Sequence, residues 1–284
     1  GFLANLGVLS VLLGRGDTAY ADRLNHASLI DGVRLAGAES RRYRHKDTAH
    51  LGAFLEQAAG PGRRVIVTES VFSMDGDLAP VAELARLARQ HGAVLAVDEA
   101  HAIGIFGPGG GGICSGLTPE ARPAVILGTL SKALGSYGGF CACSAALREL
   151  LINRARPFIY STALPPAALA GALAAVRRVR REPELGARLL ERVRFFHARL
   201  LAEGLLLPAP ESQILPLPVR GNERALEFAR RLRARAIVAT AIRAPTVPAG
   251  AERLRLSVTL AHTEADLAEA AAALGKTARE LGVL

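Results

Sequence analysis

Short apolar runs alternate with helix-patterned segments in the first half of the chain. Runs rich in Val and Ile cover residues 65–68, 94–98, 125–128 and 140–144. Between two of these runs, apolar side chains recur at helical spacing, at Val81, Leu84, Leu87 and Ala88. Pro80 suits the first turn of this helix and Gly92 suits its end. This order predicts an α/β fold with a mainly parallel sheet, covered by helices on both faces.

The hydrophobic pattern changes after residue 166. A helical region rich in Ala, Leu and Arg extends to about residue 203, with an interruption at Glu182-Pro183-Glu184. Beyond it we expect strands at 214–219, 237–242 and 254–258, and helices at 222–235 and 263–281. We therefore predict two domains, a large α/β domain over residues 1–175 and a small α+β domain over residues 176–284.

Two reactive side chains follow the apolar runs of the large domain. Asp98 closes one run, and Lys132 comes shortly after another. Ligands of parallel sheets bind beyond the carboxyl ends of the strands, where Ser73 and His101 are also expected. A lysine in this place, beside hydroxyl groups, is expected to be poorly solvated, which lowers its pKa and makes its amine a nucleophile. We interpret Lys132 as a Schiff-base lysine.

Asp98 fits the acidic partner that a Schiff-base cofactor needs. Pyridoxal phosphate acts as an electron sink when its ring nitrogen is protonated, and a carboxylate keeps that proton in place. Taken alone, an aspartate at a strand end is as often a helix or turn cap. Its combination with Lys132 and with the nearby His101 favours the cofactor role.

The glycine-rich run at residues 107–112 invites comparison with phosphate-binding loops. It matches neither the dinucleotide fingerprint nor the P-loop, because no Lys-Ser or Lys-Thr pair directly follows it. We interpret it as a flexible loop. Backbone N–H groups at a helix start, together with hydroxyl groups, are better suited to phosphate. Gly1 and Phe2 open the first expected helix, and Thr129 and Ser131 precede Lys132.

Length and composition indicate a globular protein with a substantial core. The chain has 284 residues, 50% of them hydrophobic, and its 35 basic and 26 acidic residues give a formal charge of +9. Nucleic acid is one candidate partner, but only 5% of residues are aromatic, and no zinc-finger or RNA-binding motif is present. Solvated helix faces explain the arginines better. A functional basic patch would suit coenzyme A or an acidic carrier protein.

The three cysteines predict neither a disulfide framework nor a metal site. Cys141 and Cys143 alternate in a run that predicts buried strand packing, and Cys114 stands apart. No Cys/His set has the spacing of zinc ligands. This usage predicts the reducing cytoplasm. The apolar stretch at 161–176 contains prolines and is shorter than the ~20 residues of a spanning helix, so we expect no membrane partner.

Several motifs together resemble the α-oxoamine synthase branch of the fold-type I pyridoxal-phosphate enzymes. They follow one another in the order of that family over almost the whole chain. The resemblance, with the absence of an initiating Met, leads us to expect that an N-terminal part of the protein precedes Gly1. The motifs are Asp22–Ser28, Thr68–Asp77, Asp98–His101, Thr129–Lys132, Ile159–Thr162, Thr246–Gly250 and Arg253–Leu256.

The resemblance implies a phosphate site for the cofactor. It places Gly1 and Phe2 at the phosphate of pyridoxal phosphate, with hydroxyl groups from Thr129 and Ser131. A simple strand-end cap is the alternative role for Thr129.

The resemblance also implies contacts with the cofactor ring. It stacks His26 on the pyridine ring and makes His26, Asp98 and Lys132 the catalytic residues. It places Ser73 and His101 near the phenolic oxygen, where a donor tunes the imine. The simpler alternatives are a helix cap for His26 and turn residues for Ser73 and His101.

The substrate residues implied by the resemblance are His26, Thr246 and Arg255. Arg255 would bind the carboxylate of an amino acid, because the guanidinium fork donates two parallel hydrogen bonds. Strand alternation puts Arg253 on the same side as Arg255. A charged residue on an edge strand is the alternative for Arg255.

The implied reaction is a decarboxylative condensation of L-alanine with a pimeloyl thioester of coenzyme A or acyl-carrier protein. It gives 8-amino-7-oxononanoate for biotin synthesis, with Lys132 as the base at Cα. One alternative is a sibling activity, such as glycine C-acetyltransferase, aminolevulinate synthase or sphingoid-base synthase. Another is a noncatalytic partner subunit. The presence of Lys132, Asp98 and His101 makes that alternative less favourable. The family further implies a cytoplasmic homodimer with its site at the subunit boundary.

Overall fold

The computed structural model describes residues 1–283, which form two compact units. The first unit contains residues 1–72 and 79–183, and the second contains residues 73–78 and the chain from residue 184 onward. The division therefore falls after Pro183, whereas the sequence placed it between residues 175 and 176. That position lies inside helix α7 (Pro166–Arg181), whose continuous hydrogen bonding keeps the helix in one unit.

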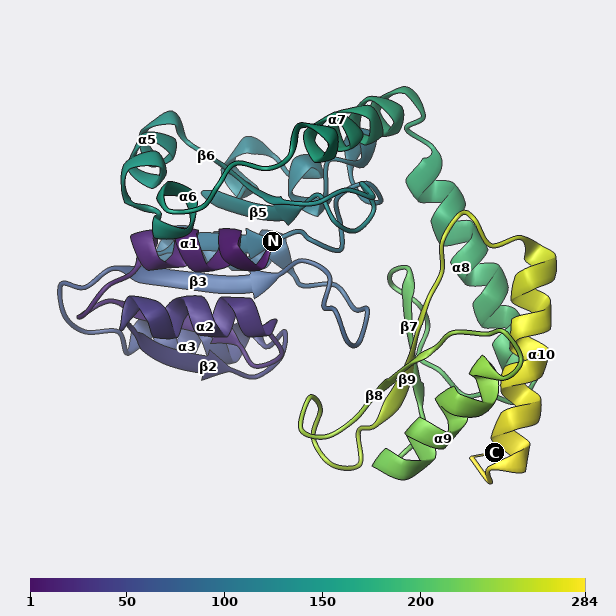
Figure 1. Cartoon of the computed structure of the whole chain (residues 1–284). Helices are drawn as coiled ribbons and strands as arrows, with labels where there is room; N and C mark the ends of the chain where they lie inside the picture. Colours follow the sequence, from purple (N-terminus) through teal and green to yellow (C-terminus); the bar gives the residue numbers. More distant parts are fainter. Residues whose placement is uncertain (284) are drawn as a thin grey trace. The chain divides into compact units, whose positions relative to one another are not determined.

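A six-stranded sheet forms the centre of the first unit (Figure 1). In spatial order its strands are β2 (Glu39–Tyr43), β1 (Thr18–Asp22), β3 (Arg64–Glu69), β4 (Val94–Asp98), β5 (Val125–Thr129) and β6 (Gly139–Cys143). All neighbouring strands are parallel except β5 and β6, which are antiparallel. The mainly parallel α/β fold expected from the sequence is confirmed.

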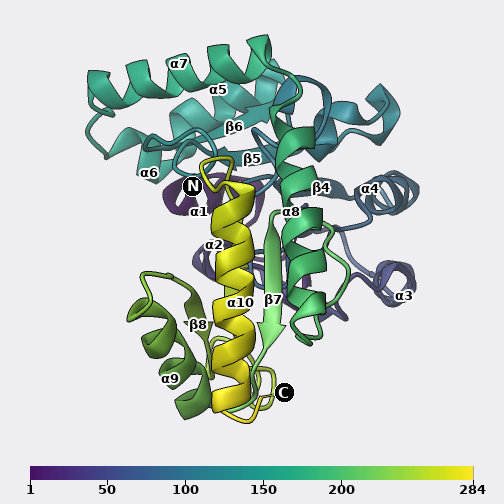
Figure 2. The same ribbon diagram turned by 90° about the vertical axis from the view of Figure 1, so that its right-hand side faces the viewer.

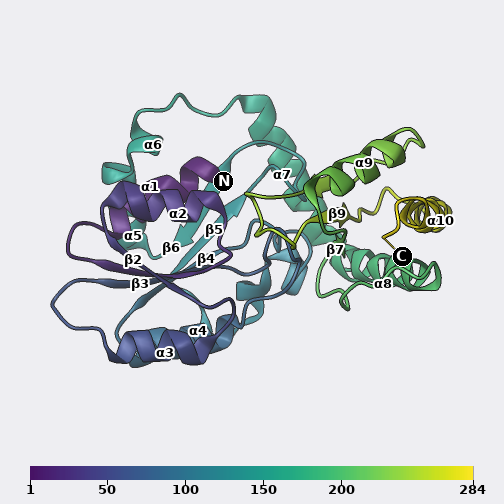
Figure 3. The ribbon, with the colours of Figure 1, turned by 90° about the horizontal axis from the view of Figure 1, so that it is seen from below.

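Helices cover both faces of this sheet (Figure 3). Helices α1 (Phe2–Leu12) and α2 (Ala27–Ala36) pack on one face, and α3 (Thr48–Glu56) and α4 (Val81–Gln90) pack on the other. Strand alternation separates the two cores, because Val65 and Val67 join the α1/α2 side while Ile66 joins the α3/α4 side. The first unit also contains α5 (Ala145–Arg154), α6 (Arg156–Ile159) and α7.

Helix α4 follows the predicted pattern with a small shift at its ends. The apolar residues expected on its core-facing side are buried. Pro80 lies just before the helix as its N-cap, not inside the first turn. Gly92 follows the C-cap His91 with a φ of 59°, a left-handed conformation that glycine adopts without steric cost.

The second unit combines long helices with a three-stranded antiparallel sheet (Figure 2). In spatial order its strands are β7 (Ile214–Pro218), β9 (Arg253–Ser257) and β8 (Thr240–Ile242). Its helices are α8 (Leu185–Ala202), α9 (Asn222–Arg233) and α10 (Glu264–Glu280). Helices α8 and α10 pack against each other, and Thr263 and Asp266 form a capping box at the start of α10. This is the expected α+β arrangement.

Strand β8 is shorter than the strand expected at residues 237–242. The chain after α9 continues in turns, in which the N–H groups of Arg235 and Ile237 both donate to the Leu232 carbonyl. Ala236 has a φ of 59°, which lies in the left-handed region and cannot be part of an extended strand. Pairing with β9 therefore begins only at Thr240.

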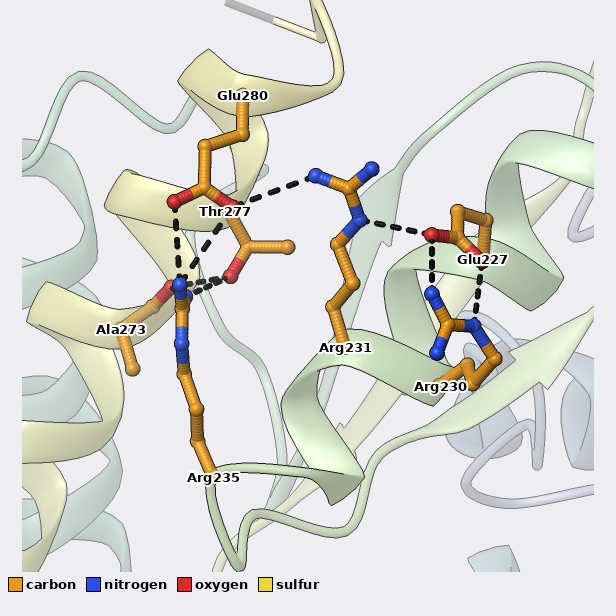
Figure 4. Close-up of polar contacts among 7 residues, drawn as sticks. All are labelled: Glu227, Arg230, Arg231, Arg235, Ala273, Thr277 and Glu280. Atoms are coloured by element: carbon orange, nitrogen blue, oxygen red, sulfur yellow. Dashed lines mark hydrogen bonds and ion pairs between the residues drawn. The ribbon is translucent and has the colours of Figure 1, made fainter.

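Arginine–glutamate pairs join α9 and the turn after it to α10 (Figure 4). Glu227 accepts hydrogen bonds from Arg230 at 2.6 Å and from Arg231 at 2.8 Å. These bonds lower the pKa of Glu227 to about 2. Arg231 and Arg235 reach Glu280 at 3.4 and 3.1 Å. Part of the arginine content is thus placed in surface ion pairs, each of which adds little stability.

Candidate functional site

A pocket lies at the carboxyl ends of the central strands of the first unit. Asp98 is the last residue of β4, and Thr129 is the last residue of β5. The starts of α1 and α2 complete the pocket. Most residues expected at a cofactor therefore meet in one place. The lining residues are Gly1, Phe2, Asn5, His26, Ser28, Glu69, Asp98, Ala100, Thr129, Ser131 and Lys132.

Lys132 lies in a turn just after β5. Its carbonyl accepts a hydrogen bond from the Gly135 N–H at 3.0 Å, and its Nζ lies 2.7 Å from Nε2 of His101. The side chain is exposed, so the expectation of a poorly solvated lysine is wrong. The turn carries the side chain beyond the buried end of the sheet. The contact with His101 is instead the feature that can control the proton of the amine.

Asp98 is held rigidly at the pocket wall. Its side chain belongs to the buried end of β4 and is 7% exposed. Oδ1 accepts a hydrogen bond from the Ala100 N–H at 2.8 Å, and Oδ2 accepts one from Nδ2 of Asn5 at 2.7 Å. The bond to Ala100 is the turn cap of the simpler interpretation. It coexists with a place in the pocket and fixes the orientation of the carboxylate.

His26 begins α2 and lines the same pocket. Its Nδ1 accepts a hydrogen bond from the Ser28 backbone N–H at 3.2 Å and lies 2.8 Å from the Ser28 hydroxyl. The rings of Phe2 and His26 form a T-shaped pair, with ring centres 6.3 Å apart. Burial lowers the pKa of His26, and the opposing effect of Asp98 is smaller. The residue is therefore both a helix cap and a pocket residue, and its lowered pKa favours the uncharged ring.

The start of α1 and the end of β5 form the side of the pocket suited to an anion. No side chain caps α1, so its first N–H groups are available to a ligand. The Thr129 hydroxyl lies 2.7 Å from the Ser131 hydroxyl and 3.0 Å from the Gly138 carbonyl. A Cβ on Gly1 would come within 3.2 Å of Thr129. Glycine at this position therefore leaves room beside the two hydroxyl groups.

The sequence did not indicate Asn5, and it gave no role to Ser28 or Glu69, although both lie in the quoted motifs. Asn5 donates to Ser28 and to Asp98, while Glu69 accepts a hydrogen bond from the His26 backbone N–H at 2.6 Å. These bonds join positions 23, 93 and 43 residues apart, so no local spacing reveals them. The signal that could have found them is a buried polar residue in an apolar segment, as Asn5 is in α1.

Ser73 and Thr246 belong to the second unit. Ser73 is buried at the start of the segment 73–78. Thr246 is exposed in the loop between β8 and β9, and its N–H donates to the Arg243 carbonyl at 2.9 Å. Their contribution to a ligand site stays a prediction.

Arg255 also belongs to the second unit and lies on β9. Leu254 and Leu256 are buried, while Arg253 and Arg255 alternate with them on the other side of the strand. Strand β9 is the central strand of its sheet, so a charged edge position does not explain Arg255. Arg253 forms an ion pair with Asp75, and a role for Arg255 in binding an anion stays a prediction.

Two structural expectations outside the pocket need correction. Cys141 and Cys143 are half-buried, because β6 is the last strand of its sheet; burial nevertheless raises the pKa of Cys141 to about 12. The glycine-rich run at 107–112 is held by hydrogen bonds, including one from the Gly112 N–H to the Phe106 carbonyl at 2.8 Å.

Among residues 1–283, no helix is long and apolar enough to cross a membrane.

The sequence has close relatives among known enzymes. Residues 1–274 match the family described as aminotransferase class I and II. An 8-amino-7-oxononanoate synthase from Alkalilimnicola ehrlichii is 50% identical over 278 residues, which are 97% of this chain and 71% of that protein. A second, from Pelobacter propionicus, is 46% identical over 100% of this chain and 73% of its own length.

Solved structures agree with this relationship. A serine palmitoyltransferase from S. paucimobilis with bound PLP–myriocin aldimine has a TM-score of 0.94 and 32% identity, covering 100% of this chain and 72% of that chain. An 8-amino-7-oxononanoate synthase from Francisella tularensis has a TM-score of 0.83 and 31% identity, covering 99% and 81%. The chain therefore belongs to the class I and II aminotransferase family of pyridoxal-phosphate enzymes, in its α-oxoamine synthase branch.

Proposed function

We propose that this chain carries out the pyridoxal-phosphate-dependent condensation of L-alanine with a pimeloyl thioester, which yields 8-amino-7-oxononanoate for biotin synthesis. The observation that carries the proposal is the meeting of His26, Asp98 and Lys132 in one pocket. Relatives that are 46% and 50% identical bear the name of this activity. The reaction class is a C-acyl transfer with loss of CO2.

The residues present fit the cofactor. The uncapped start of α1 and the hydroxyl groups of Thr129 and Ser131 would hold a phosphate. Asp98 would hold the protonated ring nitrogen, and the flat ring of His26 would lie against the pyridine. Lys132 would attach the cofactor covalently. When bound, pyridoxal phosphate supplies an electron sink for the charge that develops at Cα.

The chain's own side chains supply the proton transfers. The Lys132 amine removes the proton from Cα of alanine and later returns one to the same carbon. A carbon–carbon bond forms between Cα and the thioester carbonyl carbon, and the thiol leaves. The carboxylate then departs as CO2. Nε2 of His101 lies 2.7 Å from the Lys132 amine. It can therefore hold the proton taken from Cα until the amine returns it.

The substrate contacts rest on the motif resemblance. We assign Arg255 to the alanine carboxylate and Thr246 to a further contact with the substrate. We assign Ser73 and His101 to the phenolic oxygen of the cofactor. In support, Arg255 lies on the central strand β9, where a charged edge position does not explain it.

A sibling activity on serine is the second candidate. The serine palmitoyltransferase structure has a higher TM-score, 0.94, than the 8-amino-7-oxononanoate synthase structure, 0.83. Sequence identity favours alanine, because the biotin-synthesis relative is 50% identical and the palmitoyltransferase 32%. Turnover of the cofactor-loaded protein should be compared with alanine, serine and glycine, each with pimeloyl and palmitoyl thioesters. A preference for serine with palmitoyl thioester would overturn the proposal.

We further propose a cytoplasmic homodimer that needs no nucleic acid or membrane. Helix α5 has no buried residue, and the nearby Phe158 and Tyr160 are 66% and 72% exposed. Large apolar side chains that are exposed close together in the chain are expected at a protein–protein contact. The mass in solution, measured by light scattering, tests this assignment, and a monomer at micromolar concentration would contradict it.

A further inference from the structure

We propose that Asn5 and Ser28 are positioning residues that hold the ring of His26 in the neutral tautomer with its proton on Nε2. The inference deepens the proposed function, on which its catalytic meaning rests. His26, Ser28, Asn5 and Asp98 all lie in the first unit. None of the sequence motifs assigned a role to either positioning residue.

A continuous hydrogen-bonded path links the histidine to the aspartate. Nδ1 of His26 lies 2.8 Å from the Ser28 hydroxyl. That hydroxyl lies 2.8 Å from Nδ2 of Asn5, and the same Nδ2 lies 2.7 Å from Oδ2 of Asp98. Asn5 is 2% exposed, Ser28 is 0% exposed and Asp98 is 7% exposed. The path from Ser28 through Asn5 to Asp98 is thus shielded from water, and it joins α2, α1 and β4.

The direction of each hydrogen bond follows from the donor chemistry. The Asp98 carboxylate, when ionised, can only accept, so the Asn5 amide must present its NH2 group and not its oxygen. One amide hydrogen goes to Asp98 and the other to the Ser28 oxygen. The Ser28 hydroxyl hydrogen is then left for Nδ1 of His26.

The backbone fixes the same assignment independently. The Ser28 N–H points at Nδ1 of His26 over 3.2 Å, and a backbone N–H can only donate. Nδ1 therefore accepts two hydrogen bonds and carries no proton. In a neutral imidazole the proton then lies on Nε2. The described contacts of the ring are with Ser28 and the Phe2 ring, so the Nε2–H is left for a ligand in the pocket.

The electrostatic surroundings also favour an uncharged ring. Burial lowers the pKa of His26; Asp98 and Asp31 raise it, and Lys132 lowers it. Glu69 is engaged by the His26 backbone N–H at 2.6 Å. A neutral ring adds no positive charge beside the ring nitrogen that Asp98 would keep protonated. The positioning residues thereby separate the two roles, with charge balance from the aspartate and a neutral stacking surface from the histidine.

The test is nuclear magnetic resonance of protein with 15N-labelled histidine rings, recorded across pH with and without pyridoxal phosphate. His26→Gln assigns the signal. In the unmodified protein we expect a protonated Nε2 and an unprotonated Nδ1 at neutral pH. In Ser28→Ala we expect the His26 pKa to rise by about half a unit to one unit, because a hydrogen bond to the neutral form is lost. Asn5→Leu should shift it in the same direction.

Ser10→Ala is the matched control, because the Ser10 hydroxyl donates to the Gly7 carbonyl within α1 and takes no part in the path. It should leave the His26 signal unchanged. A proton on Nδ1 in the unmodified protein would overturn the inference without the need for any variant. So would an unchanged tautomer and pKa in folded Ser28→Ala. The measurement needs no substrate, so failure of alanine turnover would count against the proposed function alone.

Discussion

Nζ of Lys132 lies 2.7 Å from Nε2 of His101, so an amine that follows β5 meets an imidazole that follows β4. The two strands are parallel neighbours, and their carboxyl ends deliver both groups to the same edge of the sheet. One proton serves this hydrogen bond. The pair therefore provides a partner that can hold the proton when the lysine amine reacts.

Replacing His101 by Asn tests the value of this pair. An amide cannot take up a proton, so we expect turnover to fall about tenfold or more, in line with the loss of one hydrogen bond to a reacting group. Cofactor content, measured by absorbance, should stay close to normal. His91→Asn is the control, because His91 caps the C-terminal end of α4 and does not line the pocket. Full turnover in His101→Asn would remove His101 from the site.

Asp98→Asn should leave the cofactor bound but slow the removal of the alanine α-proton by at least about 10²-fold. The reason is that an amide does not balance a protonated ring nitrogen. Exchange of the alanine α-proton with deuterated water, without acyl donor, isolates this step. Asp47→Asn changes the N-cap of α3, a carboxylate that pairs with Arg44 and does not line the pocket, and should exchange normally. Equal exchange in both variants would make Asp98 a structural residue only.

Arg255→Lys should weaken alanine binding by about 10- to 100-fold while cofactor affinity stays the same. A lysine cannot reproduce the two parallel hydrogen bonds of the guanidinium fork to a carboxylate. Spectral titrations with alanine and with cofactor separate the two affinities. Arg253→Lys, on the same side of β9 but paired with Asp75, is the matched control. If the control loses as much alanine affinity as Arg255→Lys, the carboxylate anchor lies elsewhere.

The stability of the second unit should depend on Glu252 in acid. Its carboxylate accepts hydrogen bonds from the N–H groups of Gly221 and Gly250 at 2.9 and 3.0 Å. The bond from Gly221 is the main cause that holds the pKa of Glu252 below its usual value. A lowered pKa in the folded state stabilises the fold above the unfolded pKa, and this stabilisation is lost as the pH falls through the folded pKa.

Glu252→Gln should therefore lower Tm by a few degrees at pH 7, and the difference from the unmodified protein should shrink as the pH falls below about 4. Thermal unfolding followed by circular dichroism at several pH values gives both quantities. Glu223→Gln, an exposed position on α9, should change neither. A difference in Tm that grows in acid would mean that the ionised Glu252 carboxylate does not stabilise the fold.

The elements that the sequence predicts well are those with a strong local signal. The run Val94–Asp98 becomes β4 with the predicted ends, since a short run of aliphatic residues that ends at a polar one strongly favours a buried strand. The strand expected at 237–242 is largely lost to turns, because the backbone of Ala236 is left-handed. The domain boundary is also misplaced, because the change from Ala/Leu to Arg after residue 175 falls inside the continuous helix α7 and not between the two units.

The candidate site divides in the same way. Lys132 and Asp98 are predictable because Asp98 ends strand β4 and Lys132 comes three residues after the end of β5. The exposure of Lys132 was not predicted, since it depends on the direction of a turn and not on composition. Asn5 and Ser28 could not be found from spacing, because Asn5 meets Asp98 across 93 positions of the chain. Contacts of this kind become visible only when α1, α2 and β4 are placed together.

Attachment of the cofactor to Lys132 is the claim on which the account depends most. The chain contains three lysines, Lys46, Lys132 and Lys276, so attachment can be mapped without ambiguity. The protein loaded with pyridoxal phosphate should be treated with borohydride, which converts the link to a stable secondary amine, and its peptides analysed by mass spectrometry. We predict that the modification lies on Lys132 in near-stoichiometric amount and is absent from Lys132→Ala, whereas Lys276→Ala keeps it. Modification of Lys46 or Lys276 instead, or an unmodified Lys132 in loaded protein, would contradict the account.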